Sequence, residues 1–372
     1  MLSNKKILFI PEFAKYGGTR TYFKQAIRFF YENGFSATVA IEDHQIDDEI
    51  RKLINEYSFG LYVIKKKSSF SRFFLRSLVY DFFLMLKMVI KLRPSRVVIS
   101  VGALPNYILA FLLPARILYV IHTYPSSKNG LSSLIPQIIL NIFLSKNRRV
   151  LTVSEFSKKN IIQYWGIIMQ KKQKYINVVY NYSEEHISLE NTDSSQDVVL
   201  TIGHVRWYKN PIFWIDVAKK VTDSCNGKNL PTFIWAGDGE MLNECRDKCK
   251  GYDNIKFIGY CPSPEKLHGD AMIYFQPSLL ESHGISVVEA MKNRVPCVVS
   301  NIGGLPESII NEICGVVLKS WNVDDAALCI RRLLDDEKLR SYLANNAKER
   351  FDAMFNKKKW TKLMKNILNN NN

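Results

Sequence analysis

Two glutamates, Glu281 and Glu289, flank a short run of small residues, and their types and spacing suit a ligand that carries both hydroxyls and phosphate. The spacing of eight positions predicts that Glu281 lies at the mouth of a loop and Glu289 in the first turns of the following helix. Residues 282–286 would form the helix start, whose unpaired backbone N–H groups attract anions. Ionised carboxylates accept hydrogen bonds from hydroxyls. Taken alone, such a pair is also typical of glutamates that only stabilise a helix dipole. The surrounding motifs therefore decide between a ligand-binding role and this structural role.

Two cations and a glycine turn follow the first strands of the second half. Arg206 and Lys209 lie directly before Pro211, which is favoured at the first position of a helix. A diphosphate with about two negative charges needs such counter-charge when no metal supplies it. Gly237 opens a tight turn after the next strand, where we expect it to shape a ligand-binding cleft. A solvated Arg and Lys is the alternative interpretation of the pair.

The first half offers weaker signals. Gly17 and Gly18 lie between the first strand and a helix, where glycine lets the backbone approach a ligand, although the dinucleotide fingerprint is absent. His122 ends an apolar strand, a place where a histidine is more often structural than catalytic. No catalytic triad order, H-E-x-x-H motif or Asp-x-Asp pair is present, so we expect a mechanism without a metal.

The elements that position these residues alternate along the chain. Its 372 residues suit two domains, and 47% hydrophobic with 23% charged residues indicates a globular protein. Alternating strands and helices predict an α/β protein with two parallel, doubly wound sheets. The predicted strands are 6–10, 37–41, 61–64, 96–101, 117–121, 150–153, 176–180, 198–202, 232–236, 255–258, 272–275, 296–299 and 315–318. The predicted helices include 21–33, 77–92, 131–144, 211–224 and 287–293.

The polar segment 184–196 is predicted to be the linker between the domains. We expect the first domain at residues 1–183, the second at 197–345, further helices at 346–368 and a disordered tail at 369–372. The motifs fall at the carboxyl ends of strands, where ligands bind in such sheets.

Charge is unevenly distributed between the two halves. Residues 1–190 hold 27 Lys/Arg and 13 Asp/Glu, a net charge of +14, whereas the rest of the chain has a net charge of +2. Basic residues from Lys65 to Arg96 alternate with aromatic ones, which favours an anionic membrane surface. Nucleic acid and a merely solvated basic face are the alternatives, and no recognised nucleic-acid module supports the first of these.

The chain is expected to lie in the cytoplasm, at the inner face of the membrane. No N-terminal signal peptide is recognised, and no apolar stretch approaches the roughly 20 residues that span a bilayer. The seven cysteines form no C-x-x-C pair and no zinc pattern, which is typical of free thiols in a reducing compartment.

Taken together, these motifs resemble the family-four retaining glycosyltransferases, which have the GT-B fold. The resemblance is strongest over 236–307 and spans nearly the whole chain. The matching residues are Gly237-Asp238-Gly239, Pro277-Ser278, Glu281 through Met291, Val295-Pro296 and Gly303-Gly304 through Glu307, with weaker matches at Arg206, Lys209, Asn181, Ser154-Glu155, His122 and Gly17-Gly18.

The resemblance implies two Rossmann-like domains that face a central cleft, with a C-terminal helix crossing back to the first domain. It implies that Arg206 and Lys209 hold the donor diphosphate, and that the amides of His283, Gly284, Ile285 and Ser286 contact its phosphates. Glu289 would bind the ribose hydroxyls and Glu281 the donor sugar. His122 would touch the sugar near the reacting carbon, and Gly17 and Gly18 would leave room for phosphate and acceptor.

The resemblance implies transfer of a hexosyl-type sugar from a nucleotide-diphosphate sugar to a glycan or lipid-linked acceptor in surface-polysaccharide synthesis. The transfer would retain the configuration of the sugar and would need no cofactor. UDP or GDP would be the nucleotide of the donor. Three residues depart from the family pattern: His283 replaces the usual phenylalanine, Arg294 a glycine, and Tyr182 stands where Asn-Gly is common. His283 could thereby add a phosphate contact. A nucleotide-sugar epimerase of the same fold and a non-catalytic GT-B-like partner subunit are the alternatives.

Overall fold

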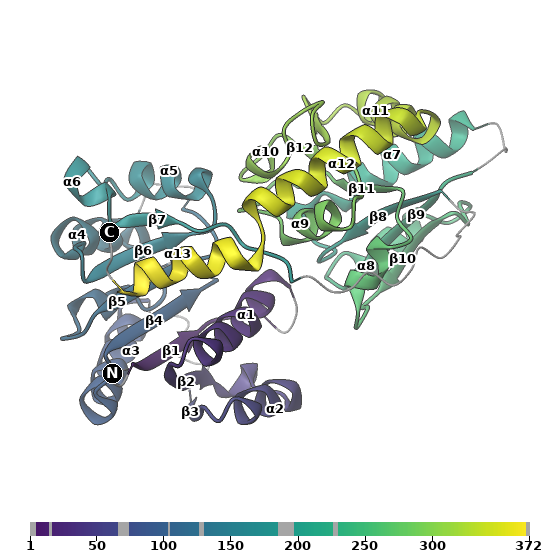
Figure 1. Cartoon of the computed structure of the whole chain (residues 1–372). Helices are drawn as coiled ribbons and strands as arrows, with labels where there is room; N and C mark the ends of the chain where they lie inside the picture. The colour runs from purple at the N-terminus through teal and green to yellow at the C-terminus, as the bar shows by residue number, and fades with distance from the viewer. Residues whose placement is uncertain are drawn as a thin grey trace. The chain divides into compact units, whose positions relative to one another are not determined.

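The computed structural model describes residues 5–14, 17–65, 74–102, 105–125, 130–184, 197–225 and 230–369. The chain divides into two compact units. The first unit comprises Met1–Val179 and Thr361–Asn372, and the second comprises Tyr180–Trp360. Each unit is built on one parallel sheet flanked by helices (Figure 1).

The first unit contains a seven-stranded sheet in the order β3-β2-β1-β4-β5-β6-β7, with every neighbouring pair parallel. Its strands are β1 (Lys6–Pro11), β2 (Ser36–Glu42), β3 (Gly60–Ile64), β4 (Arg96–Val101), β5 (Ile117–Ile121), β6 (Arg148–Thr152) and β7 (Ile176–Val178). Its helices are α1 (Gly18–Glu32), α2 (Asp48–Glu56), α3 (Phe74–Leu92), α4 (Leu131–Phe143), α5 (Glu155–Tyr164) and α6 (Gln170–Gln173), with 3₁₀ turns η1 (Asp43–Gln45) and η3 (Ile108–Leu112).

The second unit contains a six-stranded parallel sheet in the order β10-β9-β8-β11-β12-β13. Its strands are β8 (Val198–Ile202), β9 (Thr232–Ala236), β10 (Ile255–Gly259), β11 (Ile273–Gln276), β12 (Cys297–Ser300) and β13 (Val316–Leu318). Its helices are α7 (Pro211–Ser224), α8 (Leu242–Lys248), α9 (Ile285–Lys292), α10 (Leu305–Ser308), α11 (Val323–Asp335) and α12 (Glu337–Met354), with 3₁₀ turns η4 (Trp207–Lys209) and η5 (Pro264–His268).

Burial explains why these segments are strands. Every residue of β4, β5, β11 and β12 is buried, as expected for central strands covered by helices on both faces. In the second unit, Trp214 of α7 packs edge-on against Trp235 of β9 and Phe257 of β10. These aromatic contacts hold α7 against the sheet and thereby fix the loop between β8 and α7.

The last helix, α13 (Lys357–Asn369), begins in the second unit and from Thr361 onward belongs to the first. Within the first unit, the guanidinium of Arg96 donates a hydrogen bond of 2.6 Å to the carbonyl oxygen of Leu368. A cation is favourable there because the last carbonyl groups of a helix lack intrahelical partners.

The predicted α/β class and the two doubly wound parallel sheets are confirmed. The structural division falls after Val179 and again after Trp360, against predicted boundaries at 183/184 and 345/346. Residues 185–196 of the predicted linker and 370–372 of the predicted tail lie outside the described residues, whereas Asn369 ends α13. All seven cysteines are free thiols. Within the described ranges, no helix is both long and apolar enough to cross a membrane.

Candidate functional site

The second sheet reverses its strand order between β8 and β11, and the candidate site is at this position. Strands β8 and β11 are neighbours, but the chain continues from β8 toward β9 and from β11 toward β12. In parallel sheets, ligands bind beside the loops that leave the carboxyl ends of strands at such a position. Lys209 lies in the loop after β8, and Glu281 in the loop after β11.

Backbone hydrogen bonds join the two loops. The carbonyl oxygen of Tyr208 accepts from the N–H groups of Leu279, at 2.8 Å, and Leu280, at 3.2 Å. The ammonium of Lys209 is 2.5 Å from Oε2 of Glu281. The loops therefore hold a lysine and a glutamate together that are distant in the sequence.

A chain of side chains extends from this pair toward the sheet. The Gln276 amide donates to Oε2 of Glu281 at 2.8 Å, and the Tyr274 hydroxyl donates to Oε1 of Gln276 at 3.0 Å. Gln276 and Tyr274 are both buried in β11. The Glu281 carboxylate is thus oriented by a strand rather than by solvent.

Electrostatics keep Glu281 ionised. Only 14% of its side chain and 17% of that of Lys209 are exposed. Burial alone raises the pKa of the Glu281 carboxyl, but the charge and hydrogen bond of Lys209 outweigh it and lower this pKa below the ordinary value. The site therefore presents a carboxylate that accepts hydrogen bonds beside an ammonium that donates them.

Glycines let the loops approach this closely. A Cβ on Gly303 would lie 1.7 Å from the carbonyl oxygen of Glu281, and Gly303 has φ +60°. A Cβ on Gly237 would lie 1.9 Å from the carbonyl oxygen of Gly203, which precedes Lys209 in the loop after β8. Both positions therefore require glycine, because any side chain would push the flanking loops apart.

Helix α9 begins shortly after Glu281. Its N-cap, Gly284, has φ +86°, and the N–H groups of Val287 and Val288 donate to the Gly284 carbonyl. Ile285 and Ser286 are its first two residues, and Glu289 lies in its second turn. Oε2 of Glu289 is 3.8 Å from Nε2 of the fully buried His268. Within the part of the chain that the structure describes, neither ring nitrogen of His268 has a hydrogen-bond partner.

Arg206 is placed differently from Lys209. Its guanidinium is about half exposed and lies 3.4 Å from Glu240, which is also exposed. Trp207, beside it, has 57% of its surface exposed. A solvent-facing cation and an exposed aromatic ring therefore stand at the outer side of the loop whose inner end holds Lys209.

The His283 side chain packs among aromatic rings. Its ring is buried, with centroids 5.3 Å from the Tyr180 ring and 5.4 Å from the Phe355 ring. Burial lowers its pKa to about 4, so the ring is neutral at pH 7. The backbone N–H of His283 is hydrogen-bonded to the Glu281 carboxylate. The imidazole thus occupies an aromatic packing position, which suits the phenylalanine of the family pattern.

The remaining predicted residues lie in the first unit. Nε2 of His122 is 2.8 Å from the Ser100 hydroxyl, and its ring packs edge-on against Tyr22 at 4.4 Å. Burial lowers the pKa of His122 to about 4. Gly17, with φ +99°, caps α1, and both it and Gly18 are exposed. Within their own unit, these residues follow the carboxyl ends of β1 and β5; their predicted contacts with donor and acceptor stay predictions.

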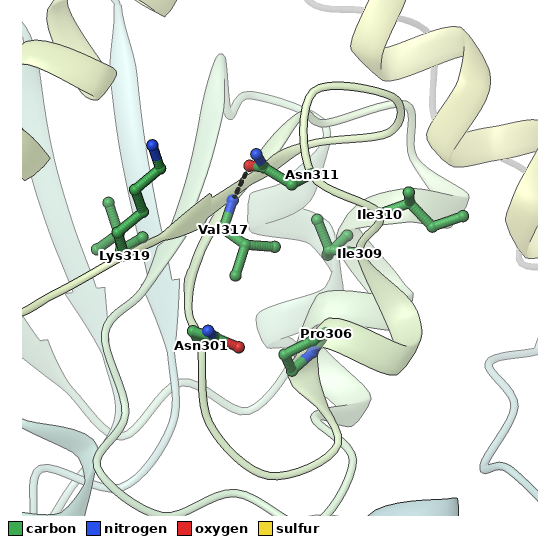
Figure 2. A pocket seen from close by; sticks show the side chains of 8 residues that line it. Asn301, Pro306, Ile309, Ile310, Asn311, Val317 and Lys319 are labelled. Atoms are coloured by element: carbon green, nitrogen blue, oxygen red, sulfur yellow. Dashed lines mark hydrogen bonds between the residues drawn. The ribbon is translucent and has the colours of Figure 1, made fainter.

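A pocket of about 350 Å³ lies elsewhere in the second unit (Figure 2). Asn301, Pro306, Ile309, Asn311 and Val317 line it, and Figure 2 shows the Asn311 side chain turned toward the N–H of Val317, which donates to it at 2.8 Å. No predicted site residue lines this pocket. Among the described residues, no three His, Cys, Asp or Glu side chains cluster as metal ligands.

Sequence reasoning missed two residues of the site. Gln276 is a polar residue at the carboxyl end of an otherwise apolar strand, a signal that could have identified it. His268 gave no comparable signal, because its place beside Glu289 depends on how η5 packs against α9. Both residues contact one of the two glutamates from which the prediction started.

The two parallel, doubly wound units have the GT-B architecture. HepE of Anabaena, whose crystal structure contains UDP and glucose, superposes with a TM-score of 0.74 over 98% of this chain and 100% of its own, at 17% identity. At that identity, the likeness establishes the fold alone.

The sequence of the second unit is similar to a known family. Residues 183–350 match the family model described as Glycosyl transferases group 1. An uncharacterized glycosyltransferase of Methanocaldococcus jannaschii is 28% identical over 59% of each chain. The UDP-Gal:alpha-D-GlcNAc-diphosphoundecaprenol alpha-1,3-galactosyltransferase of Escherichia coli is 25% identical over 43% of this chain and 42% of its own. The chain thus spans about half the length of these curated relatives.

Proposed function

We propose that the chain is a retaining glycosyltransferase that moves a hexosyl-type sugar from a nucleotide-diphosphate donor to a glycan or lipid-linked acceptor in surface-polysaccharide synthesis. The observation that carries this proposal is the Lys209–Glu281 pair at the point where the second sheet reverses its order. Transfer needs a cation for the leaving diphosphate and an acceptor of hydrogen bonds for the sugar, and this pair supplies both.

The donor diphosphate would lie between Lys209, Arg206 and the first amides of α9. Two cations and a helix start supply positive charge where the leaving group develops negative charge, so no metal is required in this proposal. Ile285 and Ser286 begin α9 and would contribute its first amides, and Gly284 lets the chain enter the helix at that angle. Gly237 would keep the neighbouring loop clear of the ligand.

The two glutamates would bind the hydroxyl groups of the donor. Glu281, held ionised and oriented by Gln276, would accept hydrogen bonds from the sugar hydroxyls. Glu289 would accept them from the ribose hydroxyls. The HepE structure with UDP and glucose and the UDP-Gal donor in the name of the Escherichia coli relative favour UDP as the nucleotide.

The acceptor side of the proposal is a lipid-linked glycan at an anionic membrane surface. The Escherichia coli relative acts, by its name, on a diphosphoundecaprenol-linked sugar. In the first unit, α3 exposes Leu75, Val79, Phe83 and Ile90 together with Arg76 and Lys87. Lys66, Lys67, Phe70, Arg72 and Phe73 of the predicted basic and aromatic stretch lie outside the described residues.

The test is a transfer assay with purified protein, a panel of UDP- and GDP-sugars and undecaprenyl-diphosphate-linked acceptors. We expect the parent to form product, and Glu281→Gln to lower turnover at least tenfold, or about 1.4 kcal/mol of activation free energy. Release of free nucleotide without any acceptor glycoside would favour an epimerase instead. If the protein neither transfers sugar nor releases nucleotide, and binds no donor, the result would favour the alternative of a non-catalytic partner subunit.

A further inference from the structure

Helix α4 has no charged residue and presents a row of apolar side chains to the surface. Leu131, Leu134, Ile138 and Ile142 are each 48–60% exposed. Their spacing of three or four residues places them on one side of the helix. The opposite side packs into the core through Ile139 and Leu140. Two-sided hydrophobicity is unusual for a helix at the surface of a soluble domain.

A neighbouring segment extends this row. The Asn141 side chain donates to the carbonyl oxygen of Gly166 at 2.9 Å. The Lys172 ammonium donates to the carbonyl oxygens of Ile142, at 3.0 Å, and Leu144, at 2.7 Å. These bonds hold residues 166–172, which include the start of α6, at the C-terminal end of α4. Within this segment, Ile168 is 81% exposed and Met169 is 48% exposed.

The six side chains form what we call the apolar ridge: Leu131, Leu134, Ile138, Ile142, Ile168 and Met169. Exposed apolar side chains gathered in this way mark a surface that binds a protein, a ligand or a membrane. The charges around the ridge indicate which of these partners it binds.

The residues around the ridge are basic. Lys146 follows α4, and Lys171 and Lys174 follow Met169; all three are exposed. From Tyr57 to Ser183 the sequence contains only two carboxylates, Asp81 and Glu155, and Asp81 is buried. The ridge is therefore apolar in its centre and positively charged at its rim.

We propose that the apolar ridge of α4 inserts into the interfacial layer of an anionic lipid bilayer, with Lys146, Lys171 and Lys174 at the headgroups. This inference rests on the membrane attachment proposed above, and it adds the surface of α4 to the exposed residues of α3 named there. An apolar helical face with a basic rim is the composition of helices that lie in the plane of a membrane surface. At 13 residues, α4 is too short to span a bilayer, so it would lie along the surface.

The same charges disfavour a second copy as the partner. Two ridges packed against each other would bring the rim lysines of both copies together, and like charges at an interface repel. An anionic bilayer meets both the apolar centre and the positive rim.

Flotation with lipid vesicles tests this assignment. The vesicles contain phosphatidylcholine alone or phosphatidylcholine with the anionic lipid phosphatidylglycerol, and binding is measured at low and high salt. We expect binding to the anionic vesicles only, and weaker binding at high salt. Ile138→Asp combined with Ile142→Asp should lower the apparent partition coefficient at least tenfold. Ile168→Asp lies outside α4, so it tests the ridge without touching the helix.

The matched control is Leu328→Asp, since Leu328 is 70% exposed on α11 of the second unit. We expect this variant to float like the parent. Equal flotation of the ridge variants and the parent would overturn the assignment, as would a concentration-dependent dimer that the ridge variants abolish. Thermal unfolding with UDP-sugars separates the two proposals, because ridge variants should retain any donor-induced shift even if the ridge assignment fails.

Discussion

Nζ of Lys209 lies 2.5 Å from Oε2 of Glu281, although 72 positions separate these residues. They meet because β8 and β11 are adjacent in the sheet and because Tyr208 accepts hydrogen bonds from the loop that carries Glu281. The pair is nearly buried, so each partner compensates the other's loss of hydration. In the proposed function, a bound diphosphate would also contact Lys209. The same lysine would then stabilise both the Glu281 carboxylate and the leaving group.

Removing Lys209 should therefore impair both folding and transfer. Lys209→Ala leaves the buried Glu281 carboxylate without its cation, and breaking such a pair costs on the order of 3 kcal/mol of unfolding free energy. We expect transfer to fall at least tenfold, about 1.4 kcal/mol. Chemical denaturation and initial-rate measurements on the same preparations give both values.

The double variant Lys209→Ala with Glu281→Gln separates the two effects. We expect it to regain most of the stability, because neither charge is left unpaired, while turnover stays low. Lys220→Ala is the matched control, since Lys220 pairs with Asp324 at 2.6 Å in a solvent-exposed position. Recovery of turnover in the double variant would show that the pair is structural only.

Gly303→Ala should displace Glu281. The new Cβ would meet the Glu281 carbonyl oxygen at 1.7 Å, and alanine is also strained at φ +60°. Gly34→Ala has similar strain at φ +68° but nothing within 4 Å of the added Cβ. Both variants should lose about 1 kcal/mol through backbone strain. Only Gly303→Ala should lose donor affinity, measured by calorimetric titration with a UDP-sugar; equal affinities in the two variants would remove the steric explanation.

His283 should make stability depend on pH. Burial lowers its folded-state pKa to about 4, against an ordinary value of 6.5. Between these values the unfolded chain binds a proton that the folded chain does not, so stability is present above about pH 6.5 and is lost as the pH falls toward 4. The loss amounts to about 3 kcal/mol for this group.

The variant His283→Phe tests this dependence, because phenylalanine fits the packing against Tyr180 and Phe355. Denaturation at pH 7.0 and pH 4.5 should show a smaller loss of stability in the variant than in the parent. His122 contributes a similar dependence, so some loss remains. His44→Phe, at an exposed histidine, should behave like the parent. An undiminished loss in His283→Phe would show that the buried imidazole is not the cause.

Much of this structure could be predicted because its signals are local. The strands 96–101, 117–121, 198–202 and 232–236 agree to the residue, since each is an apolar run closed by turn residues. The placement of Lys209 and Glu281 in loops after strands and of Glu289 in the following helix agrees with the prediction, because each strand end is marked locally in the sequence. Their roles stay predictions. The contacts of Gln276 and His268 could not, because they depend on which loops pack together. The exposure of α4 could not be predicted from the sequence either. An apolar helix has the same sequence pattern whether its second face is covered by other elements or exposed to solvent.

Nucleotide binding at the site itself tests the proposed function most directly. Thermal unfolding is measured with UDP-, GDP-, CMP- and dTDP-sugars for the parent, for Glu289→Ala and for Glu349→Ala, an exposed glutamate on α12 that serves as control. A ligand at a hundredfold excess over its dissociation constant should add about 2.7 kcal/mol of stability. We expect a shift for one nucleotide class, UDP first, that is lost in Glu289→Ala and kept in Glu349→Ala. No shift with any donor, or a shift that Glu289→Ala retains, would contradict the proposed donor site.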